Sequence, residues 1–236
     1  MKVTSAIILA GGLGTRLRSV VPDLPKPMAP VGGRPFLEYQ LDYWIDQGIK
    51  HFIFSVGFRY DVIIDHFGSS YNGAKLDYAV EKEPLGTGGG FLLAVKNLGG
   101  DAPFLLLNGD TYFEASLRTL IKFFLVNDAD WCFSLFPVNE KDRYMGVDIS
   151  QRGRIISLQS SAAQLGGLAN GGVYLVHPRT LSGARYNSKD KVSLENDIFP
   201  VALAKGQRFF GVEFSSVFID IGVPSDYSRA ERLLVP

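Results

Sequence analysis

The 236-residue sequence is poor in cysteine, has no excess of charge of either sign and contains no long hydrophobic run. Its one cysteine, Cys132, excludes an internal disulfide framework, and its neighbours Trp131 and Phe133 predict a buried strand thiol. The 24 basic residues balance the 24 acidic ones, so charge gives no reason to expect nucleic acid or an anionic membrane as a partner. The apolar run 6–10 is too short for a signal peptide or a membrane span. We expect a cytoplasmic protein with a small-molecule partner.

Two common phosphate-binding motifs are missing as well. A Walker A motif needs Gly-Lys-Ser/Thr, and the dinucleotide fingerprint needs a third glycine at the position of Leu17. The three histidines, His51, His66 and His177, lack the spacing of metal ligands, and we interpret them as structural.

The order of apolar runs predicts an α/β fold. Short Val, Ile, Leu and Phe runs alternate with stretches of helical period, which is typical of a mostly parallel sheet covered by helices. The predicted strands are residues 5–9, 51–56, 76–80, 104–107, 131–136, 146–149, 173–176 and 217–221. The predicted helices are residues 35–47, 60–67, 88–98 and 116–126. Residues 151–170 carry few signals and are interpreted as an insertion that shapes a substrate pocket. The length favours one large domain.

A glycine-rich loop follows the first predicted strand. Gly11, Gly12 and Gly14 leave room for backbone N–H groups to approach the oxygens of a phosphate. Arg16 can form two parallel hydrogen bonds to phosphate, and Lys26 adds a compact positive charge. The alternative is a surface turn with two solvated cations. The arrangement of glycines and cations favours a site that holds and activates a triphosphate.

A second candidate lies where the predicted strand 104–107 runs into Asn108-Gly109-Asp110. The carboxyl end of a strand is where open α/β sheets bind ligands, and Asp110 could hold a magnesium ion there. The alternative is an ordinary turn, because Asn-Gly and Gly-Asp are both turn dipeptides.

The segment from Leu9 to Leu17, with Pro25-Lys26-Pro27, resembles the opening signature of the sugar-1-phosphate nucleotidyltransferases. The resemblance extends from the first strand to the last helix and implies a Rossmann-like three-layer sandwich with a mostly parallel mixed sheet. It also implies in-line attack of a sugar 1-phosphate on the α-phosphorus of a nucleoside triphosphate, with pyrophosphate leaving and no protein nucleophile.

The resemblance implies roles for individual residues. The catalytic residues would be Arg16, Lys26 and Asp110, and the Mg²⁺ ligands Asp110 and Asp220, since Phe218-Ile219-Asp220-Ile221-Gly222 is similar to the family's second metal segment. The nucleotide-binding set would be Leu9, Ala10, Gly11, Gly12, Gly14, Thr15, Glu81, Gly86 and Thr87. The sugar-binding set would be Asn108, Gly109, Asn170, Gly171 and Glu195.

Glu81 bears on the choice of base. Relatives that use uracil or thymine often carry glutamine at the matching position, whereas a carboxylate can accept from both N1–H and the N2 amine of guanine. Glu81 therefore favours GTP. An exposed charged turn is the alternative, and some relatives with glutamate and a run similar to Thr87–Gly90 use UTP.

The sugar end departs from the family pattern. Many relatives carry a Glu-Lys pair before the Asn-Gly segment, but here Leu158-Gln159-Ser160-Ser161 occupies the comparable stretch, which leaves no lysine for the sugar phosphate. The chain ends at Pro236 without the hexapeptide β-helix of many relatives, so we expect a single catalytic domain over residues 1–236. A homodimer is compatible with the resemblance.

Within the family, the motifs are most similar to the branch that transfers guanylate to D-glycero-α-D-manno-heptose 1-phosphate for capsule or lipopolysaccharide synthesis. Three alternatives stay open at this point. They are a uridylyl- or thymidylyltransferase, a mannose-1-phosphate guanylyltransferase, and a non-catalytic nucleotide-sugar sensor with the same fold.

Overall fold

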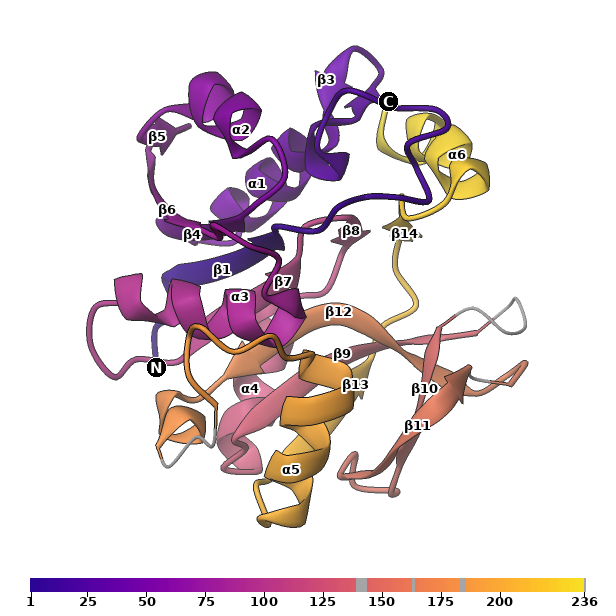
Figure 1. Cartoon of the computed structure of the whole chain (residues 1–236). Helices are drawn as coiled ribbons and strands as arrows, with labels where there is room; N and C mark the ends of the chain where they lie inside the picture. The colour runs from indigo at the N-terminus through magenta and orange to yellow at the C-terminus, as the bar shows by residue number, and fades with distance from the viewer. Residues whose placement is uncertain (139–143, 163, 183–185, 236) are drawn as a thin grey trace.

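The centre of the fold is a mixed β-sheet with helices on both faces (Figure 1). The computed structural model describes residues 1–138, 144–162, 164–182 and 186–235. One half of the sheet consists of β1 (Ser5–Ala10), β4 (His51–Val56), β5 (Ser70–Tyr71), β6 (Ala74–Val80) and β7 (Phe104–Asn108). Strands β7, β1, β4 and β6 lie side by side in parallel, and β5 pairs antiparallel with β6 at the edge. The four parallel strands lie close to their predicted bounds.

Helices cover both faces because the strands are apolar on both sides. Ala6 and Ile8 of β1 face one core and Ile7 faces the other, since successive side chains of a strand point to opposite faces. The first core is shared by α1 (Phe36–Asp46), α2 (Tyr60–Phe67) and α4 (Leu117–Val126). The second is shared by α3 (Gly86–Ala94) and α5 (Phe199–Ala204). Figure 1 shows α3 on the opposite side of β1 and β4 from α1 and α2.

Strand β12 (Leu168–Val176) joins this half to an antiparallel one. It runs antiparallel to β7 along one edge and to β9 (Trp131–Pro137) along the other. Strand β13 (Phe209–Glu213) pairs in parallel with β9. The first residues of β12 pair with β10 (Met145–Ile149), whose hairpin partner is β11 (Ile155–Ala162). The interval 151–170, interpreted as an insertion, thus holds regular strands.

A third, smaller apolar cluster forms around the carboxyl-terminal helix. The elements near it are η1 (Lys26–Met28), β2 (Pro30–Val31), β3 (Arg34–Pro35), β8 (Thr111–Phe113), β14 (Phe218–Asp220) and α6 (Pro224–Leu234). Ala230 of α6 and Ile221 pack in this cluster with Leu17 and Val31. The Tyr227 hydroxyl donates to the Pro30 carbonyl. The end of the chain therefore holds the loop that follows β1 in place.

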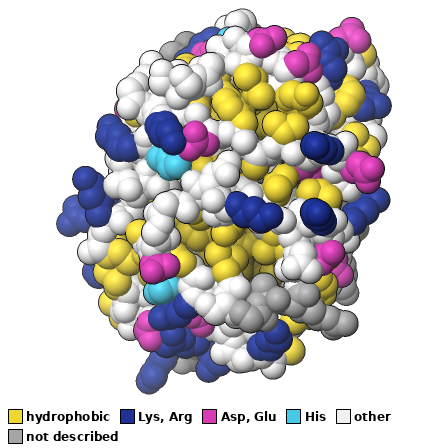
Figure 2. Space-filling model, turned by 60° about the vertical axis from the view of Figure 1, so that its left-hand side comes forward, with side chains coloured by type: hydrophobic (Ala, Val, Ile, Leu, Met, Phe, Trp, Pro, Cys, Tyr) yellow, Lys and Arg dark blue, Asp and Glu magenta, His cyan; other side chains and the backbone are white. Residues whose placement is uncertain are grey.

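The predicted buried strand thiol agrees with the structure. Cys132 is fully buried in β9, and burial raises the pKa of its thiol well above the ordinary value. His51 contacts Asp77 and His66 contacts Glu38. Figure 2 shows basic and acidic side chains interspersed on the face it draws. No helix in the described ranges is both long and apolar enough to cross a membrane. The predicted α/β class with a mostly parallel central sheet is confirmed.

Candidate active site

A cavity of about 490 Å³ opens between the loop after β1 and the turn before α3, and we call it the cleft. The residues that line it are Leu9, Gly11, Gly12, Leu13, Gly14, Thr15, Glu81, Pro84, Gly86, Thr87, Asn108, Asp110 and Lys191. A hollow of about 60 Å³ shares Gly12, Gly14 and Asp110 with the cleft and adds Lys26 and Gly109. The structure thus brings the predicted nucleotide-binding residues to the same place as Lys26 and Asp110.

Two glycines allow the segments that bound the cleft to approach one another. The Gly109 N–H donates to the Leu9 carbonyl at 3.0 Å, and a Cβ on Gly109 would lie 2.6 Å from that oxygen. A Cβ on Gly11 would lie 2.2 Å from Glu81 Oε1. Because real Cβ atoms do not come this close to oxygen, a larger residue at Gly109 would force the backbones apart, and one at Gly11 would displace the Glu81 carboxylate.

Lys26 and Asp110 form an ion pair beside the glycine-rich loop. Lys26 Nζ donates to Asp110 Oδ2 at 2.6 Å, and the two side chains are 12% and 32% exposed. Lys26 begins the short turn η1 between two prolines, and Asp110 follows the carboxyl end of β7, as predicted. Arg16, in contrast, is exposed on the loop after β1 and is not among the residues that line the cleft. Only one of the two predicted phosphate-binding cations therefore lies against Asp110.

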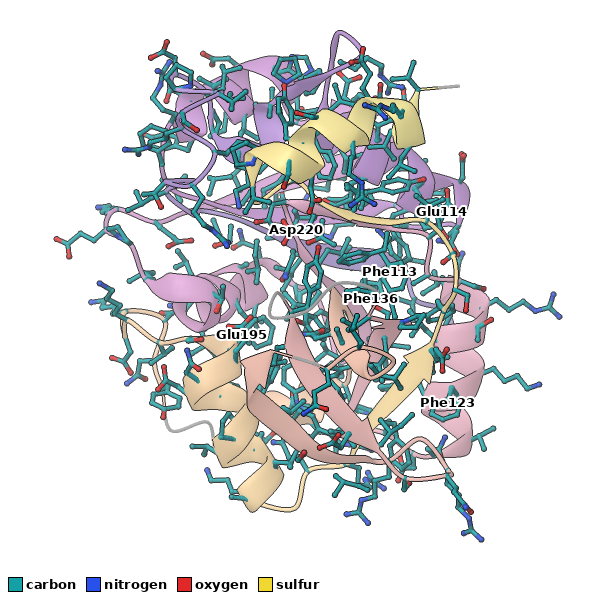
Figure 3. The ribbon with its side chains drawn as sticks, turned by 90° about the vertical axis from the view of Figure 1, so that its right-hand side faces the viewer. Phe113, Glu114, Phe123, Phe136, Glu195 and Asp220 are labelled. Atoms are coloured by element: carbon teal, nitrogen blue, oxygen red, sulfur yellow. The ribbon has the colours of Figure 1, made fainter. Side chains whose placement is uncertain are left out.

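Asp220 lies next to the Asp110 turn through backbone pairing. Strand β14 pairs antiparallel with β8 so that Asp220 is opposite Thr111, and the Ile221 N–H donates to the Asp110 carbonyl at 2.9 Å. The Gly222 N–H donates to Asp220 Oδ1 at 2.6 Å. Figure 3 places Asp220 near the middle of the molecule, between the half that carries α6 and the half that carries Glu195.

The donor chemistry of the two carboxylates fits a magnesium ion. Mg²⁺ prefers oxygen ligands and usually takes one or two protein carboxylates, with waters and phosphate oxygens completing its shell. No group of three or more His, Cys, Asp or Glu side chains in the described part of the chain is placed to hold a metal by itself. Two carboxylates, Asp110 and Asp220, match the number that Mg²⁺ usually takes from a protein.

Glu81 is buried and held by the chain around it. Its side chain follows β6, is 9% exposed, and accepts hydrogen bonds from Ser55 Oγ at 2.9 Å and from the Leu85 N–H at 3.0 Å. Its neighbours Lys82 and Glu83 are exposed. Glu81 lines the cleft and also an adjoining hollow of about 470 Å³ that contains Phe58. This position differs from the exposed charged turn that was its alternative interpretation.

Thr87 and Glu195 are joined directly, although they were predicted for different substrates. Thr87 Oγ1 donates to Glu195 Oε2 at 2.8 Å and accepts from the Leu194 N–H at 2.9 Å. Glu195 lies in η4 (Leu194–Ile198), a single turn of π-helix, and also accepts from Ser193 Oγ at 2.8 Å. A π-helical turn is uncommon and is often found at functional sites. The contact joins the first turn of α3 to η4.

Asn170 and Gly171 lie where β12 departs from regular pairing with β9. Asn170 Nδ2 donates to the Tyr174 hydroxyl at 2.7 Å, and Asn170 Oδ1 accepts from the Gly172 N–H at 3.1 Å. Tyr174 is fully buried, and burial raises the pKa of its hydroxyl well above the ordinary value. The carboxylates of Glu195 and Asp110 raise that pKa further. The charges of Glu195 and Asp110 therefore both act on the tyrosine that Asn170 contacts.

A model of the nucleotidyl transferase family matches residues 5–235. The chain belongs to this family. It is 40% identical over 222 residues to the D-glycero-α-D-manno-heptose 1-phosphate guanylyltransferase of Campylobacter jejuni. This match covers 94% of this chain and 96% of that protein. It is 38% identical to the protein of the same name from Aneurinibacillus thermoaerophilus, and the match covers 97% of both chains. A mannose-1-phosphate guanylyltransferase from Mycobacterium tuberculosis is 32% identical, and the match covers 98% of this chain and 64% of that protein.

Solved structures agree with this assignment. HddC from Yersinia pseudotuberculosis, crystallised in a complex with GMP-PN, has a TM-score of 0.85 and 35% sequence identity, and the match covers 98% of this chain and 99% of that one. A putative glucose-1-phosphate thymidylyltransferase from Bacillus anthracis has a TM-score of 0.81 at 23% identity, which shows the shared fold alone.

The structure of this nucleotidyltransferase places two residues at the site that were missing from the sequence-based prediction. Lys191 precedes η4 and lines the cleft with Asn108 and Asp110. Gln40 of α1 donates to the backbone around Asp110. No local motif marks either residue in the sequence. The stretch 158–161, which replaces the family's Glu-Lys pair, lies in β11, and the side chains of residues 159–162 are outside the described ones.

Proposed function

We propose that this nucleotidyltransferase transfers guanylate from GTP to D-glycero-α-D-manno-heptose 1-phosphate and releases GDP-heptose and pyrophosphate. The observation that carries the proposal is the cleft, where a glycine-rich loop, the Lys26–Asp110 ion pair and the buried carboxylate of Glu81 meet. Two relatives of that name match nearly the whole chain, and the similar HddC structure contains GMP-PN.

The cleft supplies the requirements of an in-line nucleotidyl transfer. The attacking phosphate is already ionised at neutral pH, so the enzyme needs to align two anions and offset their charge rather than provide a nucleophile. The backbone of Gly11, Gly12 and Gly14 would hold the triphosphate, and Lys26 would place its charge beside the α-phosphate. Arg16, exposed at the loop, would bind the outer phosphates once nucleotide is present.

A Mg²⁺ ion would be held by Asp110 and Asp220. When bound, the ion supplies positive charge to phosphate oxygens on the α-phosphorus and helps to orient them. The residues of the chain set its place: the Ile221 to Asp110 backbone bond fixes the two carboxylate-bearing segments relative to each other. Lys26 stays within reach of Asp110 Oδ2, so the local charge of the carboxylate is partly balanced before substrates bind.

Two further residues would set substrate choice. Glu81 would accept hydrogen bonds from guanine, because its carboxylate is oriented by Ser55 and the Leu85 N–H at the wall of the cleft. Lys191 would bind the phosphate of the sugar 1-phosphate in place of the lysine that is missing from the stretch 158–161. Asn170 and Glu195 would lie on the side of the sugar ring.

The test is a matrix of pyrophosphate release. GTP, UTP, dTTP, CTP and ATP are each combined with heptose, mannose and glucose 1-phosphates in the presence of Mg²⁺, and binding of each nucleotide is measured separately by calorimetry. We expect turnover with GTP and the heptose 1-phosphate, and loss of turnover when EDTA removes the metal.

Other outcomes would replace parts of the proposal. Turnover with mannose 1-phosphate or with UTP would keep the reaction and change the substrate. Nucleotide binding without turnover of any pair would indicate a nucleotide-sugar sensor instead. Turnover that survives EDTA would remove the metal from the mechanism.

We also propose that the enzyme acts in the cytoplasm as a homodimer and supplies a capsule or lipopolysaccharide pathway. The single buried cysteine suits a reducing compartment. The sugar nucleotide that the enzyme would make is a building block for surface glycans. Light scattering of the purified protein would decide the oligomeric state, and a monomeric mass would refute the dimer.

A further inference from the structure

Gln40 lies beneath the turn that carries Asp110. The side chain projects from α1, is 1% exposed, and uses its one amide nitrogen twice. Nε2 donates to the Asn108 carbonyl at 2.8 Å and to the Thr111 carbonyl at 2.7 Å. These two carbonyls flank Gly109 and Asp110, so a single amide spans the turn at which the chain leaves β7 and enters β8.

The backbone of the turn itself is fastened from two other sides. The Gly109 N–H donates to the Leu9 carbonyl at 3.0 Å, and the Asp110 carbonyl accepts from the Ile221 N–H at 2.9 Å. Both contacts are backbone to backbone and come from the segments that carry the glycine-rich loop and Asp220. The side of the turn that faces α1 is fastened by the side chain of Gln40.

The other half of the Gln40 amide is unfavourable for stability. Its Oε1 atom is buried and has no hydrogen-bond partner among the described residues. A buried polar atom without a partner destabilises a fold, which offsets part of the stability that the two Nε2 hydrogen bonds contribute. The two bonds from Nε2 require a nitrogen with two hydrogens at this reach, which glutamine supplies and the shorter asparagine does not. The specific contribution of glutamine at this position is therefore to hold the two carbonyls of the turn.

We propose that Gln40 is a positioning residue that sets the direction of the Asp110 carboxylate, and thereby the affinity for the divalent cation. This inference rests on the proposed metal role of Asp110. Partners that orient metal ligands typically change metal affinity by about tenfold to a hundredfold when they are lost.

Gln40→Met tests the proposal, because methionine keeps the shape and removes both donors. Gln47 provides the matched control. It lies at the carboxyl end of the same helix and also fastens a loop, since it accepts from the Leu117 N–H at 2.7 Å and donates to the Ala115 carbonyl at 3.4 Å. Gln47→Met removes comparable bonds without touching the Asp110 turn.

Two readouts separate positioning from general stability. Mn²⁺ binding is measured by electron paramagnetic resonance with a non-hydrolysable GTP analogue present, and melting temperatures are measured for all variants. We expect Gln40→Met to bind Mn²⁺ about tenfold more weakly than the unchanged protein and to need correspondingly more Mg²⁺ for half-maximal turnover. Gln47→Met should lower the melting temperature and leave Mn²⁺ binding unchanged.

The proposal is overturned if Gln40→Met binds Mn²⁺ as the unchanged protein does, or if Gln47→Met weakens binding equally. If Gln40→Met does not fold, Gln40→Asn makes the same test, because it retains an amide that is too short to span the turn. An unchanged protein that binds no Mn²⁺ would also overturn it. Failure of the proposed reaction gives a different result. No combination of nucleotide and sugar 1-phosphate would turn over, but the Mn²⁺ affinities of the variants could still be compared with that of the unchanged protein.

Discussion

The part of the site proposed to bind the nucleotide and the part proposed to bind the sugar are held together by different kinds of contact. On the nucleotide side, the loop after β1 and the turn after β7 meet through backbone contacts so close that Gly109 has no room for a Cβ. On the sugar side, side-chain hydrogen bonds hold Asn170 of β12 to Tyr174, and Glu195 of η4 to Thr87, a residue predicted for the nucleotide. Backbone contacts depend on a few short motifs, whereas side-chain networks depend on many separate residues.

This difference suits the two ligands. A triphosphate presents the same charged oxygens whatever base it carries, and backbone N–H groups with one or two cations bind it without regard to side-chain identity. A sugar is distinguished by the direction of its hydroxyl groups, which side-chain donors and acceptors can match. We therefore expect loss of the close backbone contacts or of the charges beside the triphosphate to abolish catalysis or folding, and changes in side chains that contact the base or the sugar to alter affinity and selectivity.

The largest effect is expected for Asp110→Asn. The variant loses the charge that faces Lys26 and would hold the metal, so kcat should fall by about a hundredfold or more, as measured by pyrophosphate release. Asp77→Asn is the control, because that carboxylate pairs with His51 and Lys75 at the other end of β4 and β6. A loss of less than tenfold in Asp110→Asn would contradict a direct role of this carboxylate.

Gly109→Ala should destabilise the fold by about 1–3 kcal/mol, because the new Cβ would collide with the Leu9 carbonyl 2.6 Å away. Gly12→Ala provides the comparison, since a Cβ there meets nothing within 4 Å, and we expect a change within about 0.5 kcal/mol. Urea unfolding followed by circular dichroism gives both free energies. Equal values for the two variants would show that close backbone approach does not define this side of the site.

Glu81→Gln should reduce the preference for GTP over UTP by roughly tenfold, since hydrogen bonds to a charged acceptor contribute about 1.5–3 kcal/mol and the amide also presents a donor. The ratio of kcat/KM values for the two nucleotides measures the change. Glu83→Gln is the matched control, because Glu83 is an exposed carboxylate two positions along the same turn. Unaltered selectivity in Glu81→Gln would mean that the base is read elsewhere.

Glu195→Gln should have the smallest effect, a severalfold rise in KM for the sugar 1-phosphate, because it weakens one hydrogen-bonded contact with Thr87 worth about 0.5–1.5 kcal/mol. Steady-state kinetics at saturating GTP measure this change, and Asn196→Ala at the exposed neighbouring position serves as the control. An equal rise in KM for GTP would show that Thr87 and Glu195 serve the nucleotide rather than the sugar.

Local sequence patterns are enough to predict much of the first half of the fold. The helix over residues 60–67 was predicted at its observed bounds, and the strands ending before Gly11 and Gly109 were placed within a residue. Such predictions succeed because the spacing of apolar residues indicates which face of an element is buried, and glycine positions indicate turns. Both features depend on residues that are close together in the chain. The glycine-rich loop, Lys26 and Asp110 were proposed as site residues for the same reason: each belongs to a short contiguous motif.

The tertiary structure decided which distant residues meet. The Lys26–Asp110 pair spans 84 positions and the Thr87–Glu195 contact 108, and no local pattern specifies either contact. The hairpin of β10 and β11, the entry of Lys191 into the cleft and the support of the Asp110 turn by Gln40 likewise follow from strand order and helix packing. The sequence by itself determined the glycine-rich loop that is proposed to bind phosphate, because this loop is made of contiguous backbone. Only the folded sheet determined how the carboxylates, the sugar-side network and their supporting side chains are arranged, because long-range packing brings them together.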